Sequence, residues 1–264
     1  VPETDPDVHA VLGASLSRGC SRARVTLAGG ETATLPGIVN ELDLSGTALG
    51  WFPREGGITG EGLEAGDVLI GLPSSGLHSN GYTLVRAVLE RSGCSLGDAA
   101  PFDAEHPSRE VDLFPDNSGG ASLGEVILNP TRIYVDPVVD LIMESRGEGG
   151  VCPEGSIKAI AHITGGGLSN LLRLHGSLGW HIGEPLSAQP EFEWIAEIGS
   201  VNSKEMHRTF NMGMGMVVAV SAAAADPVAY WLEERLSGSR VVGEVVDQGR
   251  VVTHSDSGVR FVRY

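Results

Sequence analysis

Residues 162–167 read HITGGG, and these three consecutive glycines constrain the fold more than any other feature of the sequence. They follow an apolar, strand-like stretch, IKAIAHI, at residues 157–163. Glycine inside a strand or helix is destabilising by roughly 0.5–1 kcal/mol relative to alanine. Three in succession therefore predict a tight turn after a strand, or a backbone that must approach another group very closely.

A glycine turn between a strand and a helix can also bind an anion. The residues that follow predict a short helix through Leu171 and Leu172, so several backbone N–H groups could point at one ligand. The pattern GxxxxGK[ST] is absent, and no GxGxxG follows a strand, which argues against a Walker loop and a dinucleotide site. A plain tight turn and a phosphate-binding turn both remain open.

Three further segments place polar side chains and glycines at predicted strand ends, and they are GGETA (29–33), SSGLHSNGY (74–82) and RTFNMGMGM (208–216). His78 and Asn80 belong either to a helix cap and turn or to a substrate site. Glu31 is either a solvated carboxylate or a magnesium ligand, since Mg²⁺ prefers carboxylate and phosphate oxygens. Asn211 fits turn chemistry as well as a pocket.

Charge and hydropathy limit the possible partners. The 264 residues carry a net charge of −16, with a pI of 4.8 and 41% hydrophobic residues. Such a field repels nucleic acid and anionic membranes, so neither is an expected partner. No apolar run approaches the roughly 18–20 residues that span a bilayer, which predicts a soluble globular protein. Three distant cysteines predict free thiols in a reducing compartment.

Hydrophobic periodicity predicts a mixture of helices and strands without strict alternation, which favours an α+β layered fold. Predicted helices cover 8–19, 82–93 with Ser79 as cap, a segment that Asp136-Pro137 opens, 190–199, and a segment that Asp226-Pro227 caps. Predicted strands cover 24–28, 44–52, a segment starting at Asp67, 157–163 and 215–220, with a hairpin over 241–252. Residues 95–125 are expected to form a loop.

The Gly- and acid-rich stretch EGGITGEGLEAGD, at residues 55–67, is the best candidate for a domain boundary. We therefore expect two domains. Residues 1–62 would be the remainder of an N-terminal domain, and residues 63–264 a complete C-terminal domain.

Taken together, in order and spacing, these segments resemble the phosphoribosylformylglycinamidine cyclo-ligase family, also called AIR synthetase. The resemblance is carried by LAGGETATLPG (27–37), GDVLIGLPSSGLHSNGYTLVR (66–86), LNPTRIYVDPV (128–138), AHITGGGLSNLLRL (161–174) and EMHRTFNMGMGMVV (205–218). It covers nearly the whole chain from about residue 5. FGAM synthetase, thiamine-phosphate kinase and selenophosphate synthetase are sister families that share the fold.

The resemblance implies an ATP- and Mg²⁺-dependent ligase of purine biosynthesis in the cytoplasm. Such an enzyme closes the ring of formylglycinamidine ribonucleotide (FGAM) to give aminoimidazole ribonucleotide (AIR), ADP and phosphate. It also implies a two-domain α+β fold and a homodimer in which the N-terminal domains pair to form a shared β-barrel.

The same resemblance implies roles for individual residues. His78, Glu31 and Asn211 would be catalytic, with Glu31 also a magnesium contact. The residues implied in substrate and phosphate binding are Ser79, Asn80, Arg132, Thr164, Gly165, Gly166 and Gly167.

The family begins with a Gly-rich segment, a DGVGTK loop and an ND metal-binding stretch, and this sequence contains none of them. We therefore expect that the N-terminal part of the first domain is absent from this chain. The alternatives to an active ligase are an inactive fragment, which only binds phosphate ligands or pairs with another chain, and a sister-family small-molecule kinase.

Overall fold

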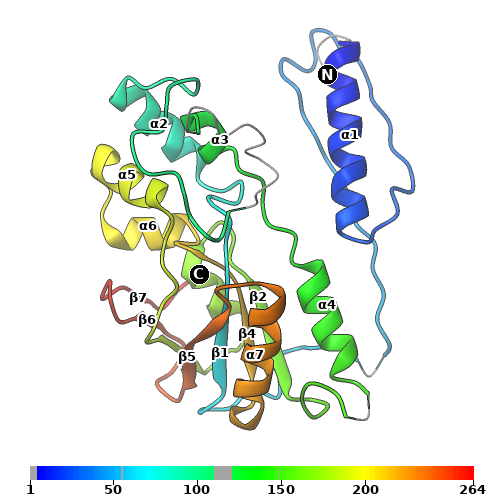
Figure 1. Ribbon diagram of the computed structural model, residues 1–264, viewed down its shortest axis with the longest axis vertical. Helices are drawn as coiled ribbons and strands as arrows, with labels where there is room; N and C mark the ends of the chain where they lie inside the picture. The colour runs from blue at the N-terminus through cyan, green and yellow to red at the C-terminus, as the bar shows by residue number, and fades with distance from the viewer. Residues whose placement is uncertain (1–4, 55, 110–120, 148) are drawn as a thin grey trace. The chain divides into compact units, whose positions relative to one another are not determined.

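The computed structural model describes residues 5–54, 56–109, 121–147 and 149–264 (Figure 1). The chain divides into two compact units. The first comprises Val1–Gly57 and Ile133–Val138, and the second comprises Ile58–Arg132 and Val139–Tyr264. The domain boundary expected after residue 62 stays a prediction.

The first unit begins with helix α1, Pro6–Arg22. The Asp5 side chain caps it by accepting hydrogen bonds from the backbone N–H groups of Asp7 (3.0 Å) and Val8 (3.2 Å). Pro6 suits the first helical position, where no N–H partner is needed. This cap starts the helix earlier than the predicted residue 8. All 17 residues of α1 are described, and none of them is buried.

The strands predicted at 24–28 and 44–52 are wrong. Both segments lie within the described ranges and run as irregular chain. A strand needs a neighbour for its backbone N–H and C=O groups, and the described part of this unit provides none. Large apolar side chains are consequently exposed, Leu49 at 94% and Trp51 at 88%.

The second unit is built on a seven-stranded sheet with the strand order β2-β4-β1-β5-β3-β6-β7. The strands are β1 (Val68–Pro73), β2 (Ile157–His162), β3 (Gly179–Ile182), β4 (Met214–Val220), β5 (Arg240–Val246), β6 (Val252–His254) and β7 (Arg260–Phe261). Neighbours pair antiparallel except β3 and β6, which pair parallel. The strands predicted from Asp67, at 157–163 and at 215–220 are thereby confirmed as β1, β2 and β4.

The hairpin predicted at 241–252 is wrong. Its two arms become β5 and β6, but β3 lies between them and pairs with both. β3 has only four residues, too few to show a two-residue hydrophobic period, and the sequence therefore did not predict it.

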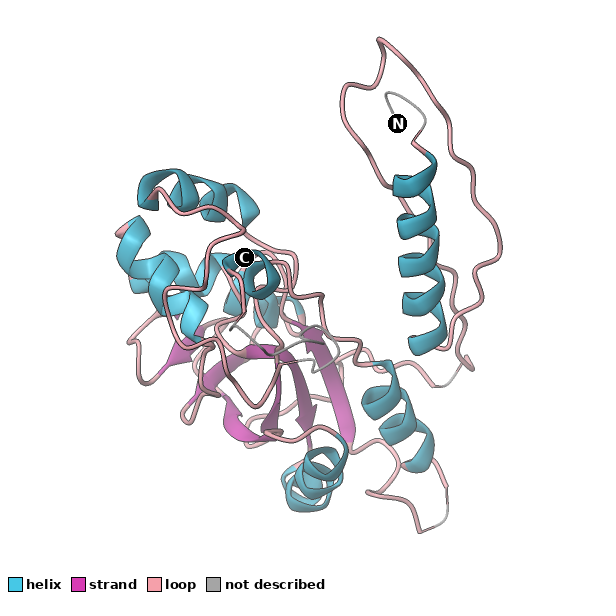
Figure 2. Cartoon of the chain, turned by 45° about the horizontal axis from the view of Figure 1, so that its top comes forward, coloured by secondary structure: helices cyan, strands magenta, loops and turns pink. Residues whose placement is uncertain are grey.

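Helices contact the sheet in two places. The 3₁₀ helix η2 (Gly167–Arg173) contacts β2, β3 and β6, and its leucines join the sheet's main hydrophobic core. Helix α7 (Ala225–Arg235) contacts β1 and β5 and follows the short 3₁₀ helix η3 (Ala222–Ala224). Figure 2 shows helices on both sides of the sheet.

A second hydrophobic cluster joins four helices, α2 (Tyr82–Ser92), α3 (Leu123–Ile127), α5 (Pro190–Gly199) and α6 (Ser203–Thr209). α2 and α5 were predicted closely. α3 lies partly in the expected 95–125 loop, of which residues 110–120 fall outside the described residues. Leu77 reaches into this cluster, so the loop after β1 connects the sheet to the helices.

In three helices the predicted N-cap residue is not the N-cap. The N-cap of α2 is Gly81, in the left-handed conformation, rather than Ser79. Helix α4 (Val135–Glu144) already includes Asp136 and Pro137. Ala224 is the N-cap of α7, so Asp226 lies in the first turn, where its charge still favours the helix dipole.

The described residues contain no helix that is long and apolar enough to cross a membrane. The three cysteines, all within the described ranges, are free thiols, as predicted.

We expect Trp180→Ala to lower the free energy of unfolding by about 3–5 kcal/mol, because it empties a fully buried site in β3. Trp180→Phe should cost much less, since it keeps most of the packing and removes a buried indole N–H that has no partner in the described chain. Urea unfolding followed by circular dichroism measures both. Trp51→Ala, at an exposed position, is the control. Equal losses for Trp180→Ala and Trp51→Ala would contradict this placement of the core.

Candidate functional site

The loop after β1, residues 74–82, folds back sharply. Gly76, His78, Ser79 and Gly81 all have positive φ, at 151°, 54°, 56° and 72°. Non-glycine residues seldom adopt this conformation, and when they do the surrounding structure holds them there. The loop is therefore fixed by contacts beyond its own sequence.

His78 supplies the main contacts. Its ring is buried, and Nε2 accepts hydrogen bonds from the backbone N–H groups of Ser75 (2.9 Å) and Arg132 (3.3 Å). The Ser75 hydroxyl, 3.0 Å from Nε2, donates to the Pro130 carbonyl. Because Nε2 accepts, the proton of the neutral ring is on Nδ1. His78 thus ties the loop after β1 to the 130–132 segment.

Burial lowers the pKa of His78 from its ordinary value of 6.5 to about 3, and the nearby His162 and Arg132 add to the effect. The two histidine rings lie 6.3 Å apart and edge to face. Burial also lowers the pKa of His162. Both rings are therefore neutral near pH 7, and neither places a positive charge in the site.

The predicted pair Ser79 and Asn80 lies at the tip of the loop. The Asn80 amide donates to the His78 carbonyl (2.7 Å), and the Ser79 hydroxyl accepts from the Thr131 hydroxyl (3.4 Å). A Cβ on Gly165 would lie 3.5 Å from the Asn80 oxygen. The structure therefore brings the loop tip beside the triple-glycine turn.

The structure shows why two of the three residues 165–167 are glycines. A Cβ on Gly167 would overlap the backbone carbonyl of His207 in α6. A Cβ on Gly166 would lie 2.9 Å from the Tyr264 ring, a distance that real Cβ atoms do not adopt. Close approach of other groups therefore accounts for two of the three glycines, and Gly165 stays open and exposed.

The polar groups of the turn are unequally used. The Asn170 amide donates to the carbonyls of Thr164 (3.4 Å), Gly165 (3.3 Å) and Gly167 (2.6 Å). The Ser169 hydroxyl donates to the Gly166 carbonyl (2.7 Å).

The N–H groups of Gly165 and Gly166, by contrast, donate to no other residue that the structure describes. The turn therefore presents free donors, while its acceptors are occupied.

Asn211 sits beneath the loop after β1. Its Nδ2 donates to the Gly76 carbonyl (2.8 Å), and its Oδ1 accepts from the Gly213 N–H (2.9 Å). Both contacts hold turns in place, which is the turn chemistry that the sequence had left open for this residue. The Arg132 guanidinium is likewise engaged, with the Ser108 carbonyl.

Glu31 belongs to the first unit, whereas the residues above belong to the second. Its side chain is exposed. No group of three or more His, Cys, Asp or Glu side chains that could hold a metal occurs among the described residues.

A buried ion pair behind the loop was not predicted from the sequence. The Arg109 guanidinium donates to both oxygens of Glu191, at 3.1 and 2.7 Å. Gln189, two residues before Glu191 in the sequence, donates to the Ser74 carbonyl (2.7 Å) and the Ser108 hydroxyl (2.8 Å). The one available signal was that Arg109 is the only arginine in an acidic segment, residues 101–127.

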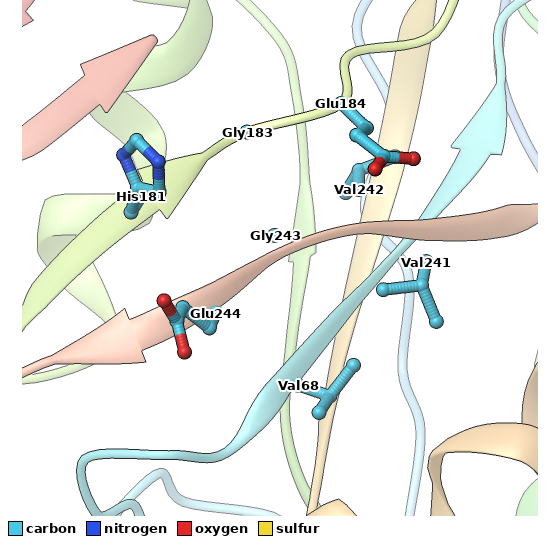
Figure 3. Close-up of a pocket in the computed structure, with 8 residues that line it drawn as sticks. All are labelled: Val68, His181, Gly183, Glu184, Val241, Val242, Gly243 and Glu244. Atoms are coloured by element: carbon cyan, nitrogen blue, oxygen red, sulfur yellow. The ribbon is translucent and has the colours of Figure 1, made fainter. Parts of the chain in front are cut away.

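A separate hollow of about 340 Å³ lies on the sheet surface (Figure 3). His181 and Glu244 stand on neighbouring strands there, with Val68, Val241 and Glu184 around them. None of the predicted site residues lines this hollow.

The fold and the glycine-rich loops define a class of protein. The family described as "AIR synthase related protein, C-terminal domain" matches residues 64–256. Among solved structures, thiamine-monophosphate kinase from Stenotrophomonas maltophilia aligns with 98% of this chain and 70% of its own, at 14% identity and a TM-score of 0.55. E. coli HypE, a hydrogenase maturation protein, aligns with 97% and 68%, at 18% identity and a TM-score of 0.53. At these identities the likeness shows the fold alone, which is the predicted α+β AIR-synthetase-like fold.

Curated relatives give the particular family. Phosphoribosylformylglycinamidine cyclo-ligase from Methanococcoides burtonii is 39% identical over 92% of this chain and 63% of its own length. The Methanothermobacter thermautotrophicus enzyme is 40% identical over 96% and 66%. The chloroplastic enzyme of Arabidopsis thaliana is 41% identical over 92% and 57%. The chain belongs to the phosphoribosylformylglycinamidine cyclo-ligase, or AIR synthetase, family, and it spans about three fifths of the length of these relatives.

We expect the protein to lose stability below about pH 6.5. The unfolded chain binds a proton on His78 below that pH, while the folded chain does not until about pH 3. Stability is therefore full above pH 6.5 and falls toward pH 3, by up to about 1.4 kcal/mol per pH unit from this residue. His254, whose pKa is lowered by burial to about 4, adds to the loss.

Urea unfolding at pH 7.5 and pH 5 measures this dependence. His78→Asn removes the titrating ring but keeps a side chain that tolerates the left-handed conformation, so it should lose about 2 kcal/mol less between the two pH values. An unchanged pH dependence in this variant would contradict the burial of a neutral His78.

Proposed function

We propose that this chain carries the C-terminal part of an ATP-dependent cyclo-ligase, which converts FGAM to AIR with release of ADP and phosphate in purine biosynthesis. The observation that carries the proposal is the 39–41% identity to three cyclo-ligases over 92–96% of this chain. The likeness to kinase and maturation-protein structures is far lower in identity, so it favours no other activity.

The chemistry gives the residues their roles. An amide oxygen is a poor leaving group, so the formyl oxygen is first phosphorylated and then leaves as phosphate when a nearby nitrogen closes the ring. The protein mainly has to position anionic ligands and stabilise their charge. The free N–H groups of Gly165 and Gly166 would bind a phosphate group, with Thr164 and Gly167 completing the turn.

The loop after β1 would form the substrate wall opposite that turn. Ser79 and Asn80 lie at its tip, beside Gly165. His78 and Asn211 hold the loop from below, and the Arg132 backbone holds His78. In this proposal His78 and Asn211 act by fixing the site. Nε2 of His78 and both polar atoms of the Asn211 amide already form hydrogen bonds with backbone groups.

Magnesium would need ligands from the bound nucleotide as well as from the protein. Mg²⁺ usually takes one or two carboxylates plus phosphate oxygens, so the exposed Glu31 can supply one ligand. When bound, the ion would neutralise charge on the ATP phosphates. We propose Glu31 for this contact, together with phosphate oxygens of the nucleotide.

A second candidate function is a fragment that binds phosphate ligands without turnover. It is favoured by the length of the chain, which covers 63% of the Methanococcoides burtonii enzyme. Residues 44–52 of the first unit form no strand, and their apolar side chains Leu49 and Trp51 are exposed, which also favours association with further chain.

For the whole protein we propose a cytoplasmic homodimer.

The test is ATP-dependent formation of AIR from FGAM, followed as an aromatic amine, with Mg²⁺ and high K⁺ present. We expect no product from this chain alone. We expect product after the preceding part of the Methanothermobacter thermautotrophicus enzyme has been joined to it. In that restored protein, His78→Ala or Glu31→Gln should each lower turnover at least about tenfold.

Product from the chain alone would overturn the fragment reading. No product from either protein, with both folded by circular dichroism, would overturn the cyclo-ligase proposal. Normal turnover in both variants would overturn the assigned residues but leave the reaction.

A further inference from the structure

Arg173 lies beside the glycine turn and makes an unusual set of contacts. It is the last residue of η2, and its guanidinium carbon lies 3.7 Å from the centre of the Tyr264 ring. The Tyr264 hydroxyl donates to the Gly165 carbonyl (3.4 Å), and the ring edge packs on Gly166. Tyr264 therefore connects the Arg173 charge directly to the turn.

A second arginine of the chain provides a comparison. Arg235 also stacks on an aromatic ring, with its guanidinium carbon 3.7 Å from the centre of Trp231. Its charge is shared with two carboxylates, since nitrogens of Arg235 lie 3.9 Å from Glu144 and 4.0 Å from Glu234. Arg173 forms no ion pair with any residue in the described ranges.

This difference matters in a chain with a net charge of −16. Acidic side chains are abundant, yet Arg173 stacks on Tyr264 and leaves the edge of its planar guanidinium available. Arginine donors fit phosphate oxygens in pairs, and stacking fixes the plane of the group before a ligand arrives. The exposed position of Arg173 leaves this edge accessible.

The turn itself favours the same kind of ligand. Its carbonyl oxygens, which would repel an anion, already accept from Asn170, Ser169 and Tyr264. The N–H groups of Gly165 and Gly166 donate to nothing else in the described chain. A cation and free donors therefore occur together, and no carboxylate in the described ranges is paired with either.

We propose that Arg173, positioned by Tyr264, is the cation of a phosphate-monoester site on the glycine turn. The ligand class is a dianionic monoester such as the 5′-phosphate of a ribonucleotide. This deepens and rests on the proposed function, because it assigns the turn to a phosphate of the ribonucleotide substrate. Arg173 contacts the ligand, whereas Tyr264 is a positioning residue that acts through Arg173.

The test is isothermal titration of the full chain with ribose 5-phosphate, inorganic phosphate and ribose. We expect both phosphates to bind and ribose not to bind. Arg173→Ala should weaken ribose 5-phosphate binding roughly tenfold or more, as expected for loss of a charge-assisted pair. The control Arg235→Ala, which removes the other stacked arginine, should stay within about twofold of the unaltered chain.

The role of Tyr264 is separated by paired variants. Tyr264→Phe keeps the stacking ring, so its binding should stay within about threefold of the unaltered chain. Tyr264→Ala and Arg173→Lys lose the stacked, planar arrangement and should each weaken binding more than Tyr264→Phe. A merely structural role would instead lower the melting temperature and weaken binding in parallel.

The proposal is overturned if Arg173→Ala binds ribose 5-phosphate as tightly as Arg235→Ala, or if the unaltered chain binds neither phosphate at 10 mM, roughly the weakest affinity expected for such a contact. Either result would leave the ring-closing reaction untouched if the restored protein still makes AIR. Loss of AIR formation with phosphate binding intact would instead contradict the proposed function alone.

Discussion

The close contact between Gly167 and the His207 carbonyl is the constraint on which the candidate site depends. It lets η2 lie directly against the end of α6, where any side chain at position 167 would overlap the carbonyl. Phe210, at the end of α6, packs against Gly81 of the loop after β1. These two contacts together set the distance between the glycine turn and that loop. The first effect of the missing side chains is this close packing. A second effect is that the turn leaves the N–H groups of Gly165 and Gly166 without a partner in the described chain.

The opposite wall of the site depends on burying polar groups with their partners. A neutral His78 is stable inside because its Nε2 accepts from two backbone N–H groups, and the Arg109–Glu191 pair is stable because both carboxylate oxygens are used. Partnered burial of this kind stabilises one conformation, whereas the loss of either member leaves an expensive unpaired group. The strained φ values at His78 and Ser79 are held by this surrounding network.

The sequence predicted the strands, helices and turns that depend mainly on neighbouring residues. The apolar runs of β1, β2 and β4, the helices α2 and α5, and the turn after β2 could all be predicted. Features set by distant residues could not. The Arg109–Glu191 contact joins residues 82 positions apart, and β3 comes between β5 and β6 through tertiary pairing. The strands expected at 24–28 and 44–52 had the right pattern but no neighbour in the described unit. The residues proposed for the site were chosen from their motifs and stay a prediction, whereas the stacking of Arg173 on Tyr264 has no sequence signal.

The measurement that addresses the glycine turn most directly is nuclear magnetic resonance of the amide groups during titration with ribose 5-phosphate, with ribose as the reference. Selective ¹⁵N-glycine labelling makes Gly165 and Gly166 observable. Their amide protons should shift downfield with the phosphate ester and stay in place with ribose, because only the anion accepts from free donors. Unmoved Gly165 and Gly166 signals, with shifts elsewhere in the chain, would show that the phosphate binds at another place and that these donors are not the site.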